Sequence, residues 1–418
     1  MKPKVSLMRR KSAHVIRGEQ GQSLLMFVLF IIVLIVFVGL GVDLGFAYIT
    51  RARLSKAVDS ACLTGVRNLL NGQGAATTAA LAAFSANYGT SGRDVAPPVV
   101  TVTYKTVSNN NVIDVNATVS IHTYFIRVLP QWATLAVGSL AEATRADVIM
   151  GLVLDRSGSM GCVPPCGSGG GAALPDAVSS FINNFDDSID MACMSSFGST
   201  ATTNVPMSQP FKSAIIAAAP GVPQDGGRTF SEGGLMIGFN LVNNTPVTAG
   251  ETVVRVIVFF TDGFANTFET NFACRVAPIN LGQSDPPFGG SFSAGAPWST
   301  EFMDPAGGSD PSCSDTTFKS IDGTTKTISA NNQNVWNEGQ LHALSVANQI
   351  RTAGILVYSI GLGGGLNQDF LRNIANDPAG SLYVTNQISG EAEFAPDASQ
   401  LTAIFNQIAT KILLRLTK

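Results

Sequence analysis

The chain of 418 residues is too long for one ordinary domain and has the length of two or three. Its 45% of hydrophobic and 13% of charged residues exclude a disordered chain and indicate a globular protein with a membrane-associated part. Six of the 26 Lys and Arg residues precede residue 20, so the remainder is acidic and has no basic stripe for nucleic acid.

An uncharged run over residues 21–42 is rich in Leu, Ile, Val and Phe. A helix of this length crosses a hydrocarbon core of about 30 Å. The alternative is a secretory signal peptide, whose apolar region is usually about 7–15 residues long and ends in a cleavage site. We expect a retained transmembrane helix over 21–43. Because the basic segment 1–20 precedes it, the positive-inside rule places that segment in the cytoplasm and the rest outside.

Residues 49–146 are expected to form a small α+β stalk module. Apolar residues recur every three or four positions from Leu54 to Leu69, which indicates that the membrane helix continues to about residue 70. A second helix is expected near residues 75–87. Three stretches rich in β-branched residues then favour strands, at 99–104, 112–123 and 134–147.

Residues 15–70 contain Glu19, Gly21, Asp43-x-Gly45-x-x-Tyr48, Arg51, Leu54 and Ala57-Val58-Asp59-Ser60-Ala61. With this spacing, residues 15–70 resemble the N-terminal segment of the TadE/TadG-like family of Tad/Flp pilus-assembly proteins. In that family the segment is an inner-membrane anchor. The resemblance implies a single-pass protein of the bacterial inner (cytoplasmic) membrane, with a cytoplasmic N-terminus and a periplasmic C-terminal domain. The sequence leaves open whether the segment is processed like a prepilin.

Two apolar runs are predicted to bring carboxylates and hydroxyls to one edge of a sheet. Residues 148–154 run into Asp155-Arg156-Ser157-Gly158-Ser159, and residues 253–261 end before Asp262. Thr229 lies between them, just before a predicted helix. Open α/β sheets bind ligands at the carboxyl ends of their strands, and hard divalent cations prefer oxygen ligands. We therefore expect a divalent metal there, Mg²⁺ first, with Mn²⁺ or Ca²⁺ as alternatives.

This order of residues resembles the metal-ion-dependent adhesion site (MIDAS) of von Willebrand factor A-type (vWA) domains. The resemblance extends over residues 147–418, and none of the five positions departs from it. It implies that Ser157, Ser159 and Thr229 coordinate the metal directly, whereas Asp155 and Asp262 act mainly through water. It also implies a protein partner that supplies an acidic side chain to the metal.

The rest of 147–418 predicts a Rossmann-like, doubly wound α/β domain whose mostly parallel sheet is covered on both faces. Residues 264–335, rich in Gly, Ser, Pro, Asn and Asp, interrupt it as a long inserted loop beside Asp262. Helices are expected at 176–185, 231–242, 337–352, 368–374 and 398–416, and further strands at 191–197, 203–210, 355–360 and 382–384.

Four of the six cysteines lie in predicted loops: Cys162, Cys166, Cys274 and Cys313. In an oxidising compartment they are candidates for disulfides, with free thiols as the alternative, and the sequence does not decide the pairing. No enzyme is predicted. Gly-x-Ser-x-Gly does not surround Ser157 or Ser159, and the third glycine of a dinucleotide fingerprint would fall at Leu366.

These features together predict a membrane-anchored, metal-dependent protein-binding or adhesion module of Tad/Flp pilus assembly or secretion. Its expected partners are components of that assembly. The alternative is a structural scaffold in which the vWA domain is a spacer that captures no ligand.

Overall fold

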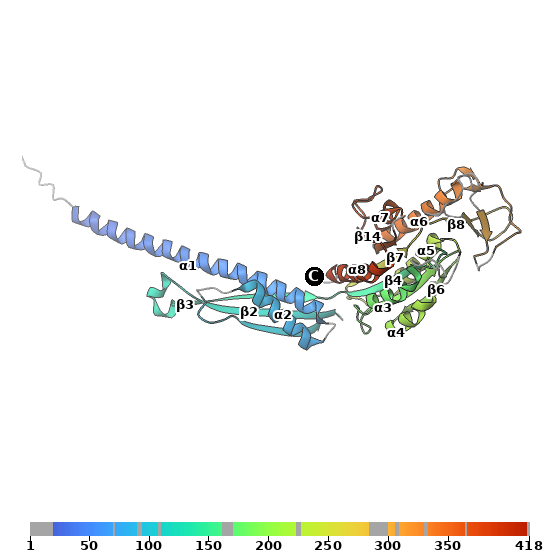
Figure 1. The fold of residues 1–418 in the computed structure, drawn as a ribbon. Coiled ribbons are helices and arrows are strands. Elements are labelled where there is room, and N and C mark those ends of the chain that lie inside the picture. Colours follow the sequence, from blue (N-terminus) through green and yellow to red (C-terminus); the bar gives the residue numbers. More distant parts are fainter. Residues whose placement is uncertain are drawn as a thin grey trace, which may run out of the picture. The chain divides into compact units, whose positions relative to one another are not determined.

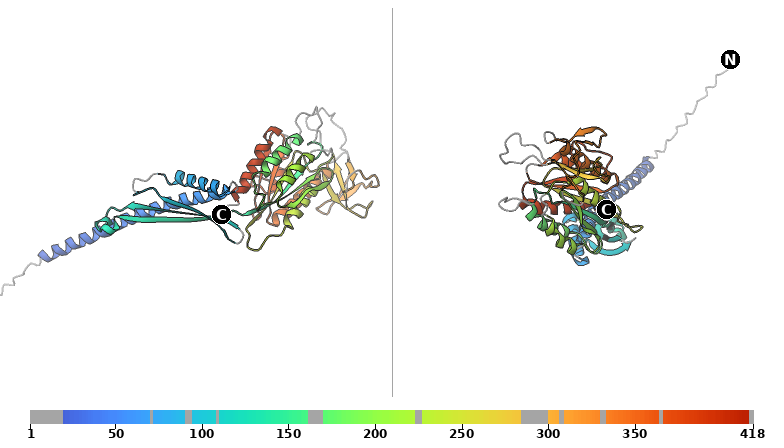
Figure 2. Two further views of the ribbon diagram at one scale, coloured as in Figure 1. Left: turned by 90° about the horizontal axis from the view of Figure 1, so that it is seen from below. Right: turned by 90° about the vertical axis from the view of Figure 1, so that its right-hand side faces the viewer.

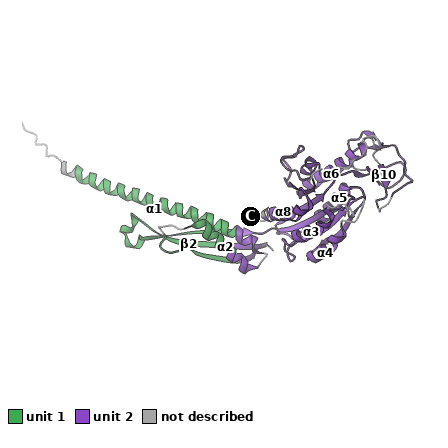
Figure 3. Cartoon of the chain, in the orientation of Figure 1, with its two compact units in different colours: residues 1–62, 79–103, 114–142 green, residues 63–78, 104–113, 143–418 purple. Residues whose placement is uncertain are grey.

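The computed structural model describes residues 20–69, 72–89, 94–107, 110–160, 170–222, 227–283, 300–305, 309–329, 333–363 and 366–415. Most of the predicted cytoplasmic segment 1–20 and both Cys162 and Cys166 lie outside them. The chain divides into unit 1, residues 1–62, 79–103 and 114–142, and unit 2, residues 63–78, 104–113 and 143–418 (Figure 3).

Helix α1 (Gln20–Arg67) continues without a break from the apolar run into the amphipathic stretch (Figure 1). Among the described residues it is the one helix long and apolar enough to cross a membrane. Its large side chains from Leu24 to Val38 are exposed, whereas Leu54, Ala57 and Val58 are fully buried. One helix therefore has a lipid-compatible half and a half that packs in a protein core.

The part of the chain after α1 contains helix α2 (Gln73–Tyr88) and a three-stranded sheet in the order β1-β2-β3. In β2, Val115, Ala117, Val119 and Ile121 are buried and alternate with more exposed residues, as in a strand with one covered face. The strands are β1 (Val99–Val107), β2 (Asn110–His122) and β3 (Thr134–Thr144).

The main sheet of unit 2 has six strands in the order β14-β13-β7-β4-β5-β6. The first five are parallel, and the edge strand β6 pairs antiparallel with β5. The predicted doubly wound, mostly parallel sheet is confirmed. Its strands are β4 (Asp147–Asp155), β5 (Met191–Phe197), β6 (Ala201–Ser208), β7 (Val253–Thr261), β13 (Leu356–Leu362) and β14 (Glu391–Ala395).

Helices cover both faces of this sheet (Figures 1 and 2). One core joins the sheet to α3 (Leu174–Ile182), α4 (Lys212–Ala218) and α8 (Leu401–Arg415). The other joins it to α5 (Ser231–Asn243), α6 (Asn334–Thr352) and α7 (Gln368–Ala375). Helix α5 lies close to the sheet because Gly238 has no side chain, and a Cβ there would be 2.5 Å from Val153.

The predicted strand 382–384 is wrong. These residues form no strand, because side chains satisfy their backbone: Leu382 N–H donates to the Asn373 side chain and Val384 N–H to that of Asn376. The edge position of the sheet is taken by β14 instead.

The prediction of a long loop at 264–335 also needs correction, because much of this insertion is folded. Apolar side chains such as Phe268, Leu281 and Phe318 form a small separate core, and Cys274 and Cys313 are joined by a disulfide. These apolar residues are scattered among polar ones, so they produce no regular periodicity in the sequence. The insertion contains β8 (Thr267–Thr270), β9 (Ile279–Gln283), β10 (Thr300–Met303), β11 (Thr317–Lys319) and β12 (Thr325–Thr327).

Candidate metal centre

The two predicted carboxylates come from neighbouring parallel strands. Strands β4 and β7 pair in register up to Leu154 and Phe260, so the residues that follow lie at the same edge of the sheet. Asp155 ends β4 and Asp262 directly follows β7. Apolar, β-branched sequence forms the buried strands, and the polar residues begin where the strands end.

Hydrogen bonds connect four of the five predicted residues. The Asp155 carboxylate accepts from the backbone N–H of Ser157 at 2.7 Å. The Ser157 and Ser159 hydroxyl oxygens lie 3.2 Å apart, and Ser159 donates to the Asp262 carboxylate at 2.6 Å. Oxygen atoms from two separate strands thus lie in one connected group.

The loop that carries Thr229 lies against the same turn. Gly158 N–H donates to the Gly227 carbonyl at 2.9 Å, which joins the serine turn to this loop. Thr229 itself is 2% exposed. Its N–H donates to the Asn266 side chain at 2.8 Å, and its carbonyl accepts from Asn266 N–H at 3.1 Å.

Two positioning residues were not predicted from the sequence. The Thr261 hydroxyl donates to the second Asp155 carboxylate oxygen at 2.5 Å. Asn266 is hydrogen-bonded to both the N–H and the carbonyl of Thr229. In the sequence, Thr261 looks like one more β-branched strand residue and Asn266 like a polar loop residue. The only available signal was that both are close in sequence to Asp262.

One side of the group is buried and the other is exposed to solvent, so a ligand could reach a bound ion from the exposed side. Asp155 and Ser157 are buried, whereas Ser159 is exposed. The donors are all oxygens, the type that Mg²⁺, Mn²⁺ and Ca²⁺ prefer. In the part of the chain that the structure describes, no group of three or more His, Cys, Asp and Glu side chains is suited to a metal. The connected group at Asp155 is of a different kind, with two carboxylates and two serine hydroxyls.

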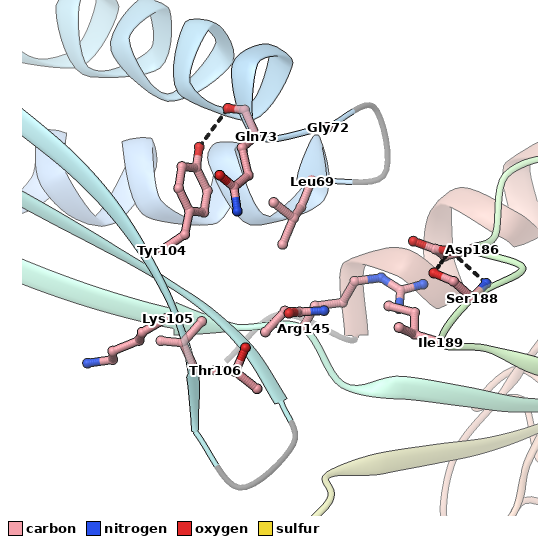
Figure 4. Close-up of a pocket in the computed structure, with 12 residues that line it drawn as sticks. Leu69, Gly72, Gln73, Tyr104, Lys105, Thr106, Arg145, Asp186, Ser188 and Ile189 are labelled. Carbon is pink, nitrogen blue, oxygen red and sulfur yellow. Dashed lines mark hydrogen bonds between the residues drawn. The ribbon is translucent and has the colours of Figure 1, made fainter.

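Unit 2 also contains a cavity of about 390 Å³, whose lining residues are shown in Figure 4. Its lining includes Tyr104, Arg145 and Asp186, together with Ile189 just before β5. Arg145 lies just before the amino end of β4, and Asp186 and Ile189 lie just before that of β5, whereas Asp155 lies at the carboxyl end of β4. A nine-residue strand spans about 30 Å at about 3.3 Å per residue, so this cavity is not part of the candidate metal centre.

A buried carboxylate holds the insertion onto α6. Glu338 is fully buried and accepts hydrogen bonds from Ser320, from Ile321 N–H and from Lys326, all of the β11–β12 region. Burial raises the pKa of Glu338, but hydrogen bonds, that of His342 first, outweigh it and lower the pKa to about 2.

His342 lies between this carboxylate and Glu232. Burial lowers the pKa of His342, but its hydrogen bonds with Glu232 and Glu338 outweigh burial and raise the pKa to about 9. The charged imidazolium therefore stabilises the contact between α5 and α6, on which the insertion packs through the Phe268 ring, 4.9 Å from that of His342. This stabilisation is fully present below the unfolded pKa of about 6.5. This stabilisation is lost as the pH rises through about 9.

Raising the pH from 6 to 10 is expected to weaken attachment of the insertion by on the order of 2 kcal/mol. Limited proteolysis across that range, with cleavage sites mapped, measures the effect. His342→Gln should remove most of the pH dependence, and His122→Gln, at an exposed histidine, should retain it. Equal pH dependence in both variants would contradict the role given to His342.

Comparison with known proteins gives one family match and several distant structural likenesses. Residues 21–68 match the Tad family, described as "Putative Flp pilus-assembly TadE/G-like". Among curated protein sequences, none matches the chain significantly.

Among solved structures, proximal thread matrix protein 1 from the mussel byssus aligns at 14% identity and TM-score 0.36, over 66% of this chain. The match spans only 47% of that protein's length. The PilB minor pilin of Streptococcus sanguinis aligns over 76% of this chain and 79% of its own, at 15% identity and TM-score 0.42. The vWF domain of the type V pili tip protein Mfa5 of Porphyromonas gingivalis aligns over 65% of this chain and 97% of its own, at 12% identity and TM-score 0.41. These likenesses are too distant to indicate function.

The sheet order and the helices on both of its faces define an α/β domain with a mostly parallel sheet. Residues 21–68, most of which lie in helix α1, are similar to the TadE/G-like segment of the pilus-assembly type.

Proposed function

We propose that the vWA domain binds one divalent metal, most favourably Mg²⁺, at Asp155, Ser157, Ser159, Thr229 and Asp262. The metal captures an acidic side chain of a protein partner. The single observation that supports this most is the hydrogen-bonded group formed by Asp155, Ser157, Ser159 and Asp262 across two adjacent strands.

The chemistry follows from the kind of ligands. Hydroxyl oxygens carry no net charge, and carboxylates that act through water neutralise a divalent cation only partly. A metal held in this way remains attractive to an outside carboxylate. Ser159 is the exposed member of the group, so a partner would approach on its side.

The proposed setting is the bacterial cytoplasmic membrane. Helix α1 anchors the chain with residues 1–20 in the cytoplasm and the vWA domain on the extracytoplasmic side, where it serves Tad/Flp pilus assembly or secretion. The family match of residues 21–68 and the exposed apolar half of α1 support this setting. The competing function is a scaffold whose vWA domain is only a spacer.

Ser159→Ala tests the metal site with little risk to the fold, because Ser159 is exposed. Mg²⁺ at about 100 times its dissociation constant is expected to stabilise the full-length protein by about 2.7 kcal/mol. Ser159→Ala should lose most of this gain. It should also lose Mg²⁺-dependent capture of partners from membrane extracts. Thermal unfolding and pull-downs, each with Mg²⁺ and with a chelator, measure both.

Ser188→Ala is the matched control. Ser188 is also exposed and also donates to an aspartate at 2.6 Å, that of Asp186, at the opposite edge of the sheet. It should behave like the wild type in both measurements. If Ser159→Ala loses metal binding while capture and assembly continue, the spacer function is correct. If Mg²⁺ stabilises neither protein, the metal site is wrong.

A further inference from the structure

The connection between β2 and β3 exposes an unusual number of large apolar side chains. Residues 124–132, here called the interface loop, include the short helices η2 (Ile126–Val128) and η3 (Pro130–Trp132), in which no residue is buried. Val128 is 83% exposed, and the other exposed members are Tyr124, Phe125, Leu129 and Trp132. Such a surface on a short loop needs a partner that covers it.

The interface loop is held against α1 by one carboxylate. Asp43 is 3% exposed and accepts three backbone hydrogen bonds, from Tyr124 at 2.8 Å, Phe125 at 3.0 Å and Ile126 at 2.9 Å. The Phe46 and Tyr124 rings lie 6.1 Å apart. The views of the ribbon also show the β2–β3 connection beside α1 (Figures 1 and 2).

Phe125 contacts α1 within the apolar run itself. Gly39 is buried beneath it, and a Cβ on Gly39 would lie 2.6 Å from the Phe125 Cβ. Gly39 precedes Asp43 by four residues, which is about 6 Å along a helix at 1.5 Å per residue. The loop therefore reaches past Asp43 onto the part of α1 that is apolar enough to lie in a membrane.

Most backbone N–H groups of the loop have an acceptor within the protein, which suits an environment with little water. The N–H groups of Tyr124, Phe125 and Ile126 donate to Asp43, and those of residues 128, 129, 132 and 133 donate to loop carbonyls. The Thr123 hydroxyl donates to the Trp132 carbonyl at 2.7 Å. Non-helical backbone enters the lipid boundary only when its polar groups are satisfied within the protein.

We propose that the interface loop inserts into the outer headgroup layer of the membrane and forms a second lipid contact beside α1. Its exposed apolar surface is continuous with the exposed half of α1 through the Gly39–Phe125 contact. Trp and Tyr are the residues that favour this layer. Arg127, the one charged residue of the loop, is exposed and suited to a lipid phosphate. The inference rests on the proposed anchoring by α1.

The physical consequence is a fixed height of the stalk above the bilayer. A single helix can tilt and slide in the membrane, whereas two contacts held together by Asp43 resist both movements. The interface loop thus fixes the distance between the bilayer surface and the stalk.

Tryptophan quenching by brominated lipids tests the proposal on the full-length protein in phosphatidylcholine vesicles. The chain has three tryptophans, so Trp298→Phe with Trp336→Phe leaves Trp132 alone. Trp132 emission should fall in vesicles whose lipids carry bromine near the headgroup. The matched control is Trp132→Phe with Trp298→Phe. It leaves Trp336, which packs against Phe264 in unit 2, and its emission should not change.

Trp132 emission that is equal in brominated and ordinary lipid would overturn the proposal, provided that alkaline carbonate leaves the protein in the vesicles. Release by carbonate would instead show that the anchoring by α1 fails. Emission that responds to protein concentration but not to bromine would assign the loop to contact with a second copy, which also overturns the lipid contact.

Discussion

Asp190→Ala is expected to lower the free energy of unfolding of the α/β domain in unit 2 by about 3–5 kcal/mol. Asp190 is fully buried and accepts from both Arg145 terminal nitrogens, at 3.0 and 2.6 Å. It also accepts from the N–H groups of Val148 at 2.9 Å and Asp186 at 2.7 Å. The substitution leaves a buried guanidinium without its carboxylate and two backbone donors without an acceptor. Urea unfolding of the detergent-solubilised chain, followed by circular dichroism, measures the loss.

Two further variants separate charge from hydrogen bonding. Asp190→Asn keeps the side-chain shape but leaves Arg145 buried and charged, so it should cost nearly as much as Asp190→Ala. Adding Arg145→Met to Asp190→Asn should recover part of the loss, because removing both charges costs less than removing one. A loss below about 1 kcal/mol for Asp190→Ala would show that the pair is not fully buried in solution.

The second large effect is expected at the disulfide of the insertion. Replacing Cys274 and Cys313 together by Ser should destabilise the small core of the insertion by about 4 kcal/mol, because the bond closes a loop of 39 residues. This core is separate from the two cores of the main sheet, so local opening rather than global unfolding is expected. Proteolysis within residues 264–335 should accelerate, while the unfolding of the main sheet changes little.

Reduction provides the control for this prediction. Dithiothreitol should make the wild-type insertion as sensitive to protease as the double Ser variant, and should add little to that variant. An insertion that stays protease-resistant after both treatments would show that its apolar residues suffice without the bond.

The sequence by itself determined most helices and strands, and the types of residue at their ends. Short apolar runs rich in β-branched residues, such as 148–154 and 253–261, favour buried strands, and polar residues directly after them lie at the carboxyl edge. The helix through residues 21–67 likewise follows from an apolar run that passes into an amphipathic stripe. These are local patterns, with periods of a few residues, and burial selects them regardless of the distant parts of the chain.

Only the tertiary structure decided which distant residues meet. Thr261 with Asp155, Asn266 with Thr229 and Arg145 with Asp190 are single polar residues without periodicity, and their partners lie up to 106 positions away. The same holds for Asp43, whose three backbone donors come from the β2–β3 connection, and for the scattered apolar residues that fold the insertion. Such contacts result from the summed packing of whole elements, which no short stretch of sequence encodes.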